Sequence, residues 1–388
     1  MSIDEDAIAL HKKHRGKLEV VPKVPLASTE DLSLAYTPGV AAVSRAVAED
    51  AEQAYELTNK GNTVAVVTDG SAVLGLGDIG PEAALPVMEG KAALFKQFAD
   101  IDAVPICLGT QNVDEIIHTV ERLAPGFGGI NLEDISAPRC FEIEDRLQNL
   151  GIPVFHDDQH GTAIVVLAAL MNAAQVVGKN LYDLSIVISG AGAAGTAITK
   201  LLSCLDMGEE KTCVPVKDII VTDINGIIHR DRQDFNSISY AIAMKTNKEN
   251  RRGGLAEALP GADVFIGVSA GNIMTGDMVK LMNDDPIIFA MANPTPEIDP
   301  AEAAKAGAAV VATGRSDYPN QVNNVLAFPG VFRGALDARA TRITNTMKLA
   351  AANALADLVQ EPLQGGILPG PMSDTVVPAM AKAVKKAA

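Results

Sequence analysis

The chain is poor in cysteine, in positive charge and in long apolar stretches, and each shortage excludes a class of protein. Its 388 residues include only four cysteines, Cys107, Cys140, Cys204 and Cys213. They form neither a C-x-x-C pair nor a cluster with histidine, so the sequence predicts neither a zinc knuckle nor a disulfide framework. We interpret all four as buried thiols of a protein in a reducing cytoplasm.

Positive charge is scarce, because 32 Lys and Arg stand against 48 Asp and Glu, a formal net charge of −16. Nucleic acids and anionic membranes attract basic surfaces, so neither is expected as the main partner. The first six residues are acidic where a secretory signal would be basic. We therefore predict no export signal and a cytoplasmic protein.

The longest apolar run, residues 162–177, is too short for a membrane span, which needs about 20 apolar residues. Asn172 and Gln175 also interrupt it. A helix that is buried on all sides shows the same composition. We expect residues 162–177 to form such a core helix.

Strands and helices alternate along most of the chain, which predicts an α/β fold. Expected strands lie at 64–67, 104–108, 129–132, 153–155, 184–189, 218–222, 263–268, 287–291 and 309–312. A chain of this length usually exceeds one hydrophobic core. We predict two domains, an N-terminal α/β domain over residues 1–160 and a Rossmann-type doubly wound domain with C-terminal helices over residues 161–388.

A glycine turn, Gly190-Ala-Gly-Ala-Ala-Gly195, follows the β-branched run at 185–188 and precedes an expected helix. Such a turn places a dinucleotide pyrophosphate on a helix N-terminus, and an acid at the end of the next strand suits the ribose 2′-hydroxyl. The residues expected to bind the cofactor are Gly190, Gly192, Ala193, Ala194, Gly195 and Asp223.

The residue after Asp223 is Ile224, and no Arg or Lys adjoins the pair in the sequence. A basic residue there would favour the 2′-phosphate of NADP, so NAD is the expected cofactor. Arg230 and Arg232 lie close enough along the chain to keep NADP possible.

Three acids follow the ends of two expected strands: Glu133 and Asp134 come after one, and Asp158 comes after the other. Ligands commonly bind at the carboxyl ends of strands in α/β sheets, and oxygen ligands suit Mg²⁺ or Mn²⁺. The alternative is a set of solvated loop acids, or acids that cap the helix after Pro138. His156 and His160 flank the second pair of acids, but no further His or Cys is spaced to complete a zinc site.

A metal ion beside a dinucleotide indicates oxidation of a small hydroxy acid, and this reaction needs a base. Lys91 lies in an otherwise apolar helix, where desolvation beside a cation would lower its pKa. A helix-surface lysine is the alternative. Tyr36 precedes a proline turn that would fix its direction, and a packed tyrosine is the alternative there.

Eight motifs make the chain resemble the malic enzymes, specifically the compact bacterial type without an appended acyltransferase domain. In family order they are Tyr36-Thr-Pro-Gly-Val40, Val67-Thr-Asp-Gly70, Gly75-Leu-Gly-Asp78, Glu89-Gly-Lys91, Leu132-Glu-Asp134, Phe155-His-Asp-Asp-Gln-His-Gly-Thr162, Ala292-Asn-Pro-Thr295 and Asn323-Asn-Val-Leu-Ala-Phe-Pro-Gly330. The resemblance spans nearly the whole chain. It implies oxidative decarboxylation of (S)-malate to pyruvate and CO₂ with a nicotinamide cofactor and a divalent cation.

The resemblance also implies roles for single residues and a homodimer. Glu133, Asp134 and Asp158 would bind the metal. Lys91 would be the base, tuned by Asp157, and Tyr36 would be the acid that protonates C3 of enolpyruvate. Asn293 and Asn324 would contact malate or the nicotinamide ribose.

The chain departs from the larger family members at Ser71 and Ala72, where they have an acid and then an arginine that grips a substrate carboxylate. Ser71, the glycine loop at 75–80 or a residue of another subunit could replace that arginine. Two rival functions stay open on the sequence. One is a metal-independent hydroxy-acid or amino-acid dehydrogenase without decarboxylation, and the other is a catalytically silent dinucleotide-binding regulator.

Overall fold

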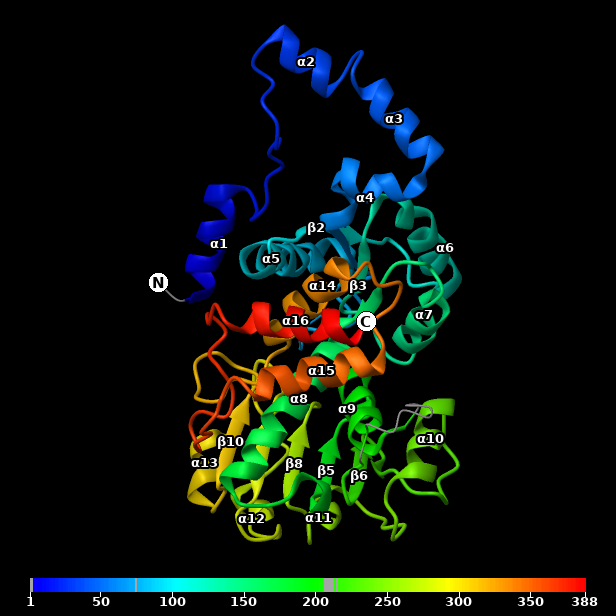
Figure 1. Ribbon diagram of the computed structural model, residues 1–388. Helices are drawn as coiled ribbons and strands as arrows, with labels where there is room; N and C mark the ends of the chain where they lie inside the picture. Colours follow the sequence, from blue (N-terminus) through cyan, green and yellow to red (C-terminus); the bar gives the residue numbers. More distant parts are fainter. Residues whose placement is uncertain (1–2, 74, 206–212, 214) are drawn as a thin grey trace.

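Two sheets form the framework of the protein. The computed structural model describes residues 3–73, 75–205, 213 and 215–388. One sheet has four strands in the order β2-β1-β3-β4, and the other has six in the order β10-β9-β8-β5-β6-β7. Helices fill the space between the sheets and cover their outer faces (Figure 1). This architecture confirms the α/β fold.

The first sheet is parallel throughout. Its strands are β1 (Thr63–Thr68), β2 (Asp102–Cys107), β3 (Gly129–Leu132) and β4 (Val154–His156), and its helices are α5 (Pro81–Ala99), α6 (Val113–Leu123) and α7 (Arg139–Leu147). Leu132 pairs with His156 in the register of β3 and β4. The residues that follow these two strands therefore leave the sheet side by side.

The second sheet is parallel except for β7, which pairs antiparallel with β6. Its strands are β5 (Ser185–Ser189), β6 (Asp218–Asp223), β7 (Gly226–Ile227), β8 (Val264–Gly267), β9 (Ile287–Ala290) and β10 (Val310–Thr313). The five parallel strands, β5, β6, β8, β9 and β10, match the expected strands, whereas β7 is too short to leave a sequence pattern. Strand order reverses beside β5, and such a switch point is where open α/β sheets bind ligands.

The helices that accompany the second sheet include four that face the first sheet, namely α8, α14, α15 and α16 (Figure 1). Their bounds, with those of the others, are α8 (Asp157–Val176), α9 (Ala193–Ser203), α10 (Ser237–Lys245), α11 (Leu255–Ala258), α12 (Gly276–Val279), α13 (Pro300–Lys305), α14 (Phe328–Asp337), α15 (Asn345–Ala356) and α16 (Val376–Ala387). Short 3₁₀ turns are η1 (Ala51–Gln53), η2 (Asn59–Asn62), η3 (Ala124–Gly126), η4 (Leu181–Asp183) and η5 (Asn324–Leu326).

Helix α8 confirms the expected core helix, since most of its residues are buried. It begins at Asp157, five residues before the expected start, so Asp157 and Asp158 lie in its first turn rather than in a loop. The proposed domain boundary at 160/161 falls inside this helix.

Phe155, just before α8, stacks edge-on against Phe332 of α14 with ring centroids 5.7 Å apart. One continuous core contains apolar residues of both sheets and of α8.

In the N-terminal arm, residues 3–49, no helix contains a buried residue. The helices of the arm are α1 (Ile3–His14), α2 (Thr29–Ala35) and α3 (Val40–Glu49), followed by α4 (Ala54–Leu57). Figure 1 shows α2 and α3 standing away from the sheets. Large apolar side chains of the arm that remain exposed are Ile3, Ile8, Leu10, Leu18, Val20, Val21, Val24, Leu26, Leu32, Leu34, Tyr36, Val40 and Val43.

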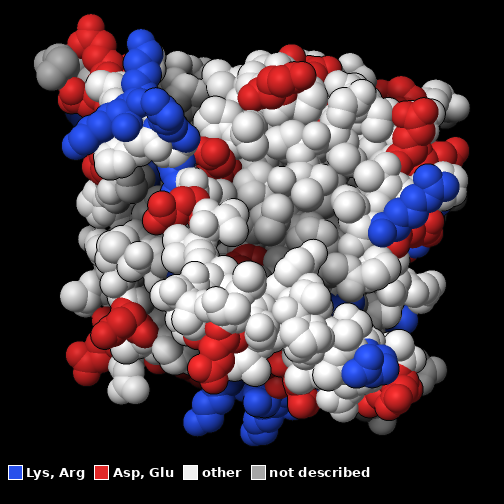
Figure 2. Space-filling view, turned by 90° about the horizontal axis from the view of Figure 1, so that it is seen from above, with Lys and Arg blue, Asp and Glu red and all other residues white. Residues whose placement is uncertain are grey.

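Seen from above, where α2 and α3 stand, the middle of the surface is uncharged and charged side chains lie mainly towards its edges (Figure 2). Within the described part of the chain, no helix combines the length and the apolar character that crossing a bilayer demands.

The interpretation of the cysteines is wrong for two of the four. Cys204 and Cys213 form a disulfide, while Cys140 is a buried thiol and Cys107 a half-buried one. Helix α9 ends at Ser203, and Cys204 adopts a left-handed conformation that turns the chain back. The backbone N–H of Val216 then donates to the carbonyl of Leu202. The two cysteines meet because of the tertiary structure, and their separation of nine residues in the sequence did not indicate a disulfide.

Candidate active site

Glu133, Asp134 and Asp158 lie together at the carboxyl end of the first sheet. One carboxylate oxygen from each can be chosen so that all three lie within 4.8 Å of one another. Glu133 and Asp134 follow β3, and Asp158 lies one residue into α8, directly after β4. Asp134 adopts a left-handed conformation, and its N–H donates a 2.8 Å hydrogen bond to Oδ2 of Asp158. The parallel pairing of β3 with β4 thus brings together acids that are 24 residues apart.

Lys91 reaches this cluster from α5. Its Nζ lies 2.5 Å from Oδ2 of Asp157 and 2.9 Å from Oε1 of Glu133. The ammonium group also lies 4.1 Å from the ring centroid of Phe328. Lys91 is only 7% exposed, which rules out a helix-surface lysine. Asn131 donates from Nδ2 to Oε2 of Glu133 at 2.7 Å and so holds the other carboxylate oxygen.

The carboxylates around Lys91 dominate its electrostatics. Burial opposes its charge, but the carboxylates of Asp157, Glu133 and Asp158 outweigh burial and raise the pKa of Lys91. The predicted lowering of this pKa refers to a lysine beside a bound cation and stays a prediction. Burial also raises the pKa values of Glu133, Asp157 and Asp158, most strongly that of Asp157. The sequence could not show how many carboxylates surround one ammonium group.

The donor set fits a hard divalent cation. Among the residues that the structure describes, Lys91 is the one cationic side chain paired with Glu133 and Asp157. Asp134 and Asp158 add two further acids to the same corner. Buried like charges need a counter-charge, and carboxylate oxygens are the ligands that Mg²⁺ and Mn²⁺ prefer. The role of Glu133, Asp134 and Asp158 as metal ligands stays a prediction that this geometry supports.

The two histidines beside the acids have other surroundings. Nδ1 of His156 lies 3.7 Å from Oδ2 of Asp158, and burial lowers the pKa of this ring. His160 contacts Oε2 of Glu144 at 2.9 Å and Nζ of Lys348 at 3.1 Å. In the described ranges, no His or Cys joins the three-carboxylate group. A zinc site gains no support from this arrangement.

Glu144 is a buried residue that sequence reasoning missed. From α7 its carboxylate accepts hydrogen bonds from the backbone N–H of His156 at 3.1 Å and from Nε2 of Gln159 at 3.0 Å, besides its contact with His160. It therefore fixes the segment that carries Asp157 and Asp158. The signal for it was weak, because an acid in an amphipathic helix usually faces solvent.

Arg139 was missed as well, and it holds the turn beside the acids. Its Nη1 donates to Oδ2 of Asp69 at 2.8 Å, and its Nη2 donates to Oγ of Ser71 at 2.9 Å. Oγ of Ser71 donates to Oδ1 of Asp69 and accepts from the N–H of Ser136. The N–H of Ala72 donates to the carbonyl of Asp134. This network ties the turn at 69–72 to the strand end that carries the first two acids.

Asn324 and Asn293 come from the second half of the chain. A methyl group at Gly161 would collide with Oδ1 of Asp157 and would lie 3.3 Å from Cβ of Asn324, so Asn324 lies beside the first turns of α8. Asn293 is exposed, and its carbonyl packs against Gly75 so closely that no side chain would fit there. Gly75 also has a φ of +71°, which favours glycine. The glycine loop thus meets Asn293 across the two halves.

Tyr36 is not brought to the acids within this chain. It ends α2 in the N-terminal arm and is 65% exposed. The alternative of a packed tyrosine does not apply to the chain as described either. The role of Tyr36 as the acid stays a prediction, and its position relative to a substrate depends on what covers the arm.

A cavity of about 1090 Å³ opens at the switch point of the second sheet. Its lining includes Gly190, Gly192 and Asp223 from the second half and Ala137 and Pro138 from the first. A side chain at position 195 would collide with the carbonyl of Gly190, so the turn requires glycine there. Ala193 and Ala194 form the first residues of α9, whose N-terminus faces this turn. The shape and the helix N-terminus fit a dinucleotide.

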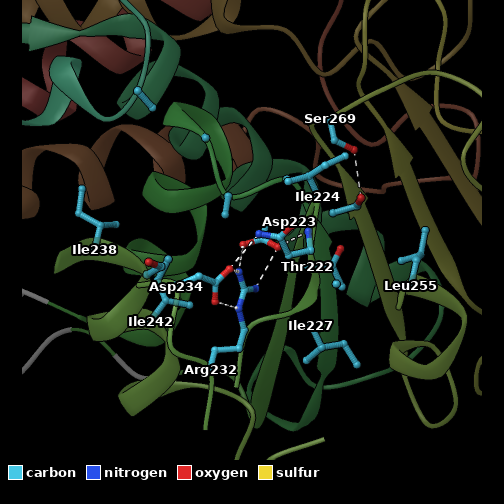
Figure 3. Close-up of a pocket in the computed structure, with 18 of the residues that line it drawn as sticks. Thr222, Asp223, Ile224, Ile227, Arg232, Asp234, Ile238, Ile242, Leu255 and Ser269 are labelled. Atoms are coloured by element: carbon cyan, nitrogen blue, oxygen red, sulfur yellow. Dashed lines mark hydrogen bonds and ion pairs between the residues drawn. The ribbon is translucent and has the colours of Figure 1, made fainter. Parts of the chain in front are cut away.

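Asp223 lies at the edge of this cavity with a partner that the sequence did not reveal. Arg232 contacts both of its carboxylate oxygens, through Nη1 at 2.9 Å and through Nη2 at 2.8 Å (Figure 3). No basic residue adjoins Asp223 along the chain, but Arg232 contacts it in the folded structure. Residues 228–236 fold back past the end of β6, and this places Arg232 beside Asp223.

Comparisons with known proteins agree with this geometry. Residues 15–148 match the family model described as "Malic enzyme, N-terminal domain", and residues 159–388 match "Malic enzyme, NAD binding domain". A bifunctional malic/malolactic enzyme of Bacillus subtilis is 55% identical over 100% of this chain and 93% of its own. An NAD-dependent malic enzyme of Geobacillus stearothermophilus is 57% identical over 96% of this chain and 77% of its own.

A solved structure of a malic enzyme is also similar to this chain. The NAD-dependent malic enzyme of Thermotoga maritima is 51% identical, superimposes with a TM-score of 0.93, and is matched over 98% of this chain and 99% of its own. Further relatives include malic enzymes named as NAD-dependent and as NADP-dependent. The two family models together match most of the chain, the Bacillus subtilis relative matches the whole of this chain, and the chain belongs to the malic enzyme family.

Proposed function

We propose that this protein oxidatively decarboxylates (S)-malate to pyruvate and CO₂, with NAD as the preferred oxidant and Mg²⁺ or Mn²⁺ as the metal ion. The observation that carries the proposal is the group of Glu133, Asp134 and Asp158 with Lys91 buried against it, in a chain of the malic enzyme family. A metal-independent dehydrogenase would have no use for three clustered acids. That alternative is therefore not favoured.

Glu133, Asp134 and Asp158 are the residues that would hold the metal ion. When bound there, a divalent cation would act as a Lewis acid on the oxygens of malate and would stabilise the enolate left by loss of CO₂. The chain itself supplies the oxygen-rich corner, and the buried ring of Phe328 lies against Lys91 beside it.

Lys91 is the residue that we propose takes the proton of the malate hydroxyl. In the structure its ammonium form is favoured by the carboxylates around it, so it must first lose a proton. Oδ2 of Asp157 lies 2.5 Å from Nζ, and burial raises the pKa of Asp157, which suits it to receive that proton. Asp157 and Lys91 would then act as a coupled pair, with the proton shared between them.

The distal carboxylate of malate needs a partner other than Ser71. The hydroxyl of Ser71 already donates to Asp69 and accepts hydrogen bonds from Ser136 and Arg139. A hydroxyl has one proton and two lone pairs, so none of its bonding capacity remains. Of the three replacements considered for the family's arginine, the glycine loop at 75–80 and a residue of another subunit remain.

NAD is the cofactor that we propose, and Gly190, Gly192, Ala193, Ala194 and Gly195 would hold its pyrophosphate at the N-terminus of α9. Asp223 would accept from the ribose hydroxyls. Asn293 and Asn324 would contact malate or the nicotinamide ribose, since Asn324 lies beside Asp157 and Asn293 faces the glycine loop.

We also propose a homodimer in which the N-terminal arm packs on a second copy. Monomeric proteins rarely leave a large contiguous apolar surface exposed, and more than ten large apolar side chains of the arm are exposed here. Tyr36 lies within this surface. The arm would carry Tyr36 to the acids of the partner subunit, where it would protonate C3 of enolpyruvate.

A cytoplasmic location is part of the same proposal. The Cys204–Cys213 disulfide is the feature that a reducing compartment would not favour. The state of these two thiols in protein isolated with alkylation at lysis tests the location directly.

The deciding experiment is a turnover assay with (S)-malate that crosses NAD and NADP against Mg²⁺, Mn²⁺ and a chelator, with CO₂ and pyruvate measured. We expect stoichiometric CO₂, pyruvate and reduced coenzyme, loss of all three with the chelator, and recovery when either metal is restored. Malate oxidation that persists in chelator without release of CO₂ would instead establish the metal-independent dehydrogenase.

A further inference from the structure

Four side chains at the end of β6 form a connected group that the proposed reaction does not explain. We call Asp223, Asn225, Arg232 and Asp234 the β6 cluster. Arg232 donates from Nε to Oδ1 of Asp234 at 2.8 Å, and its Nη2 lies 2.5 Å from Oδ2 of the same residue. Its Nη1 and Nη2 also face the two oxygens of Asp223 (Figure 3). One guanidinium therefore bridges two carboxylates.

Asn225 closes the cluster from the turn between β6 and β7. Its N–H donates to Oδ1 of Asp223 at 2.8 Å, and its Nδ2 donates to Oδ2 of Asp234 at 2.8 Å. The side chain of Arg232 is only 8% exposed, whereas those of Asp223 and Asp234 are 22% and 46% exposed. The arginine is thus held inside the cluster, and carboxylate oxygens face the cavity.

All four members lie in the lining of the dinucleotide cavity. With two acids and one base, the β6 cluster carries a formal charge of −1. A fork-shaped guanidinium is usually a strong partner for phosphate, but Arg232 directs its Nε and both Nη atoms at carboxylates. A phosphate monoester brings close to two further negative charges near neutral pH, so this corner would repel it.

We propose that Arg232 and Asp234 select the coenzyme at this site. Asp234 holds Arg232, and Arg232 in turn positions the carboxylate of Asp223 to accept hydrogen bonds from a ribose diol. The same hold keeps the guanidinium from binding a 2′-phosphate. The inference rests on the proposed use of this cavity by a nicotinamide dinucleotide, and it assigns Arg232 a positioning role rather than the role of a phosphate ligand.

Asp234→Asn tests the hold directly, because it removes one charge while keeping the shape of the side chain. With Arg232 released and the charge of the cluster raised from −1 to zero, NADPH should bind more tightly relative to NADH. We expect the ratio of the two dissociation constants to shift by about tenfold, which corresponds to about 1.4 kcal/mol. Isothermal titration calorimetry of the full chain with each reduced coenzyme, without malate, measures both constants.

Arg232→Gln separates positioning from phosphate binding. We expect weaker NADH binding, because Asp223 loses its partner, and no gain for NADPH, because two acids then face the cavity. Arg230→Gln is the matched control, since the guanidinium of Arg230 donates to the carbonyl of Lys248 and lies outside the cavity lining. It should leave both constants unchanged. Asp223→Asn provides a further variant in case loss of Arg232 prevents folding.

Two results would overturn the inference. One is a wild-type protein that binds NADPH more tightly than NADH and loses that preference in Arg232→Gln, which would make Arg232 a phosphate ligand. The other is an unchanged ratio in Asp234→Asn. Failure of the proposed function would look different, because the coenzyme constants would follow the pattern above while malate turnover stayed absent.

Discussion

Nζ of Lys91 in α5 lies 2.5 Å from Oδ2 of Asp157 in α8, although the two residues are 66 positions apart in the sequence. The contact forms because α5 packs over the first sheet while α8 starts at the end of β4. It gives the proposed base its proton acceptor and gives a fully buried carboxylate its counter-charge.

Lys91→Met should lower kcat for malate by at least about a hundredfold, because general base catalysis typically contributes a factor of about 10² to 10⁴. Binding of NADH should change little, since the residue lies outside the dinucleotide cavity. Lys96→Met is the control on the same helix, where the side chain is half exposed and pairs with Asp100 and Asp102. A Lys91→Met enzyme with wild-type kcat would remove the lysine from the proton transfer.

Asp158→Asn should abolish metal-dependent turnover and leave NADH affinity close to that of the wild type. The carboxylate of Asp158 is one of three that would share the ion, and the cofactor site is formed elsewhere. Titration of Mn²⁺, followed by its paramagnetic resonance signal, should show loss of the tight site. Asp145→Asn, an exposed acid of α7, is the control and should retain it. Retained tight binding in the Asp158 variant would exclude this residue as a ligand.

Tyr36→Phe should slow exchange of the C3 protons of pyruvate more than it weakens NADH binding. If the arm acts on a partner subunit, co-expressed Tyr36→Phe and Lys91→Met chains should recover activity that neither variant has alone. Random pairing of the two chains in a homodimer would restore about a quarter of the sites. Action of Tyr36 within its own chain predicts no recovery, so the mixed sample distinguishes the two arrangements.

Glu144 should make the protein more stable above moderately acidic pH. Burial alone would raise its pKa, but His160, Lys348 and His156 outweigh it and lower the pKa of Glu144 from 4.5 to about 2. The stabilisation is complete above pH 4.5 and is lost as the pH falls from there through about 2. Since one pKa unit corresponds to about 1.4 kcal/mol, it amounts to about 3 kcal/mol.

Glu144→Gln should therefore lower the free energy of unfolding at about pH 5, as measured by urea denaturation, and lower it much less near pH 2. Glu142→Gln lies on the same helix but pairs with Arg146 at the surface, so it should cost little at either pH. An equal loss in Glu144→Gln at both pH values would show that shape rather than charge is responsible.

Thiol titration of the unfolded protein, without reductant, should find two reactive cysteines of the four. Cys107 and Cys140 are thiols, whereas Cys204 and Cys213 are paired. Cys204→Ser should leave three reactive thiols, because Cys213 is then released. Four thiols in unreduced wild-type protein would restore the interpretation made from the sequence.

The sequence by itself determined the parallel strands of both sheets, the core helix, the glycine turn and the positions of the acids at strand ends. These features are local, because side-chain periodicity and turn residues depend on neighbours a few positions away. The acids could be expected to meet because parallel strands end at a common edge. The family motifs then attached roles to Lys91, Tyr36 and the two asparagines, which local pattern alone did not contain.

Only the tertiary structure decided the electrostatics and the partners of those residues. The raised pKa of Lys91 arises from acids that come from two other elements, and the Asp223–Arg232 contact depends on a loop that returns past β6. The same holds for Arg139 on Ser71, for Cys204 with Cys213, and for Tyr36 in an arm without buried residues. Charge interactions and covalent pairing depend on distance in space, and the linear order of residues does not record that distance.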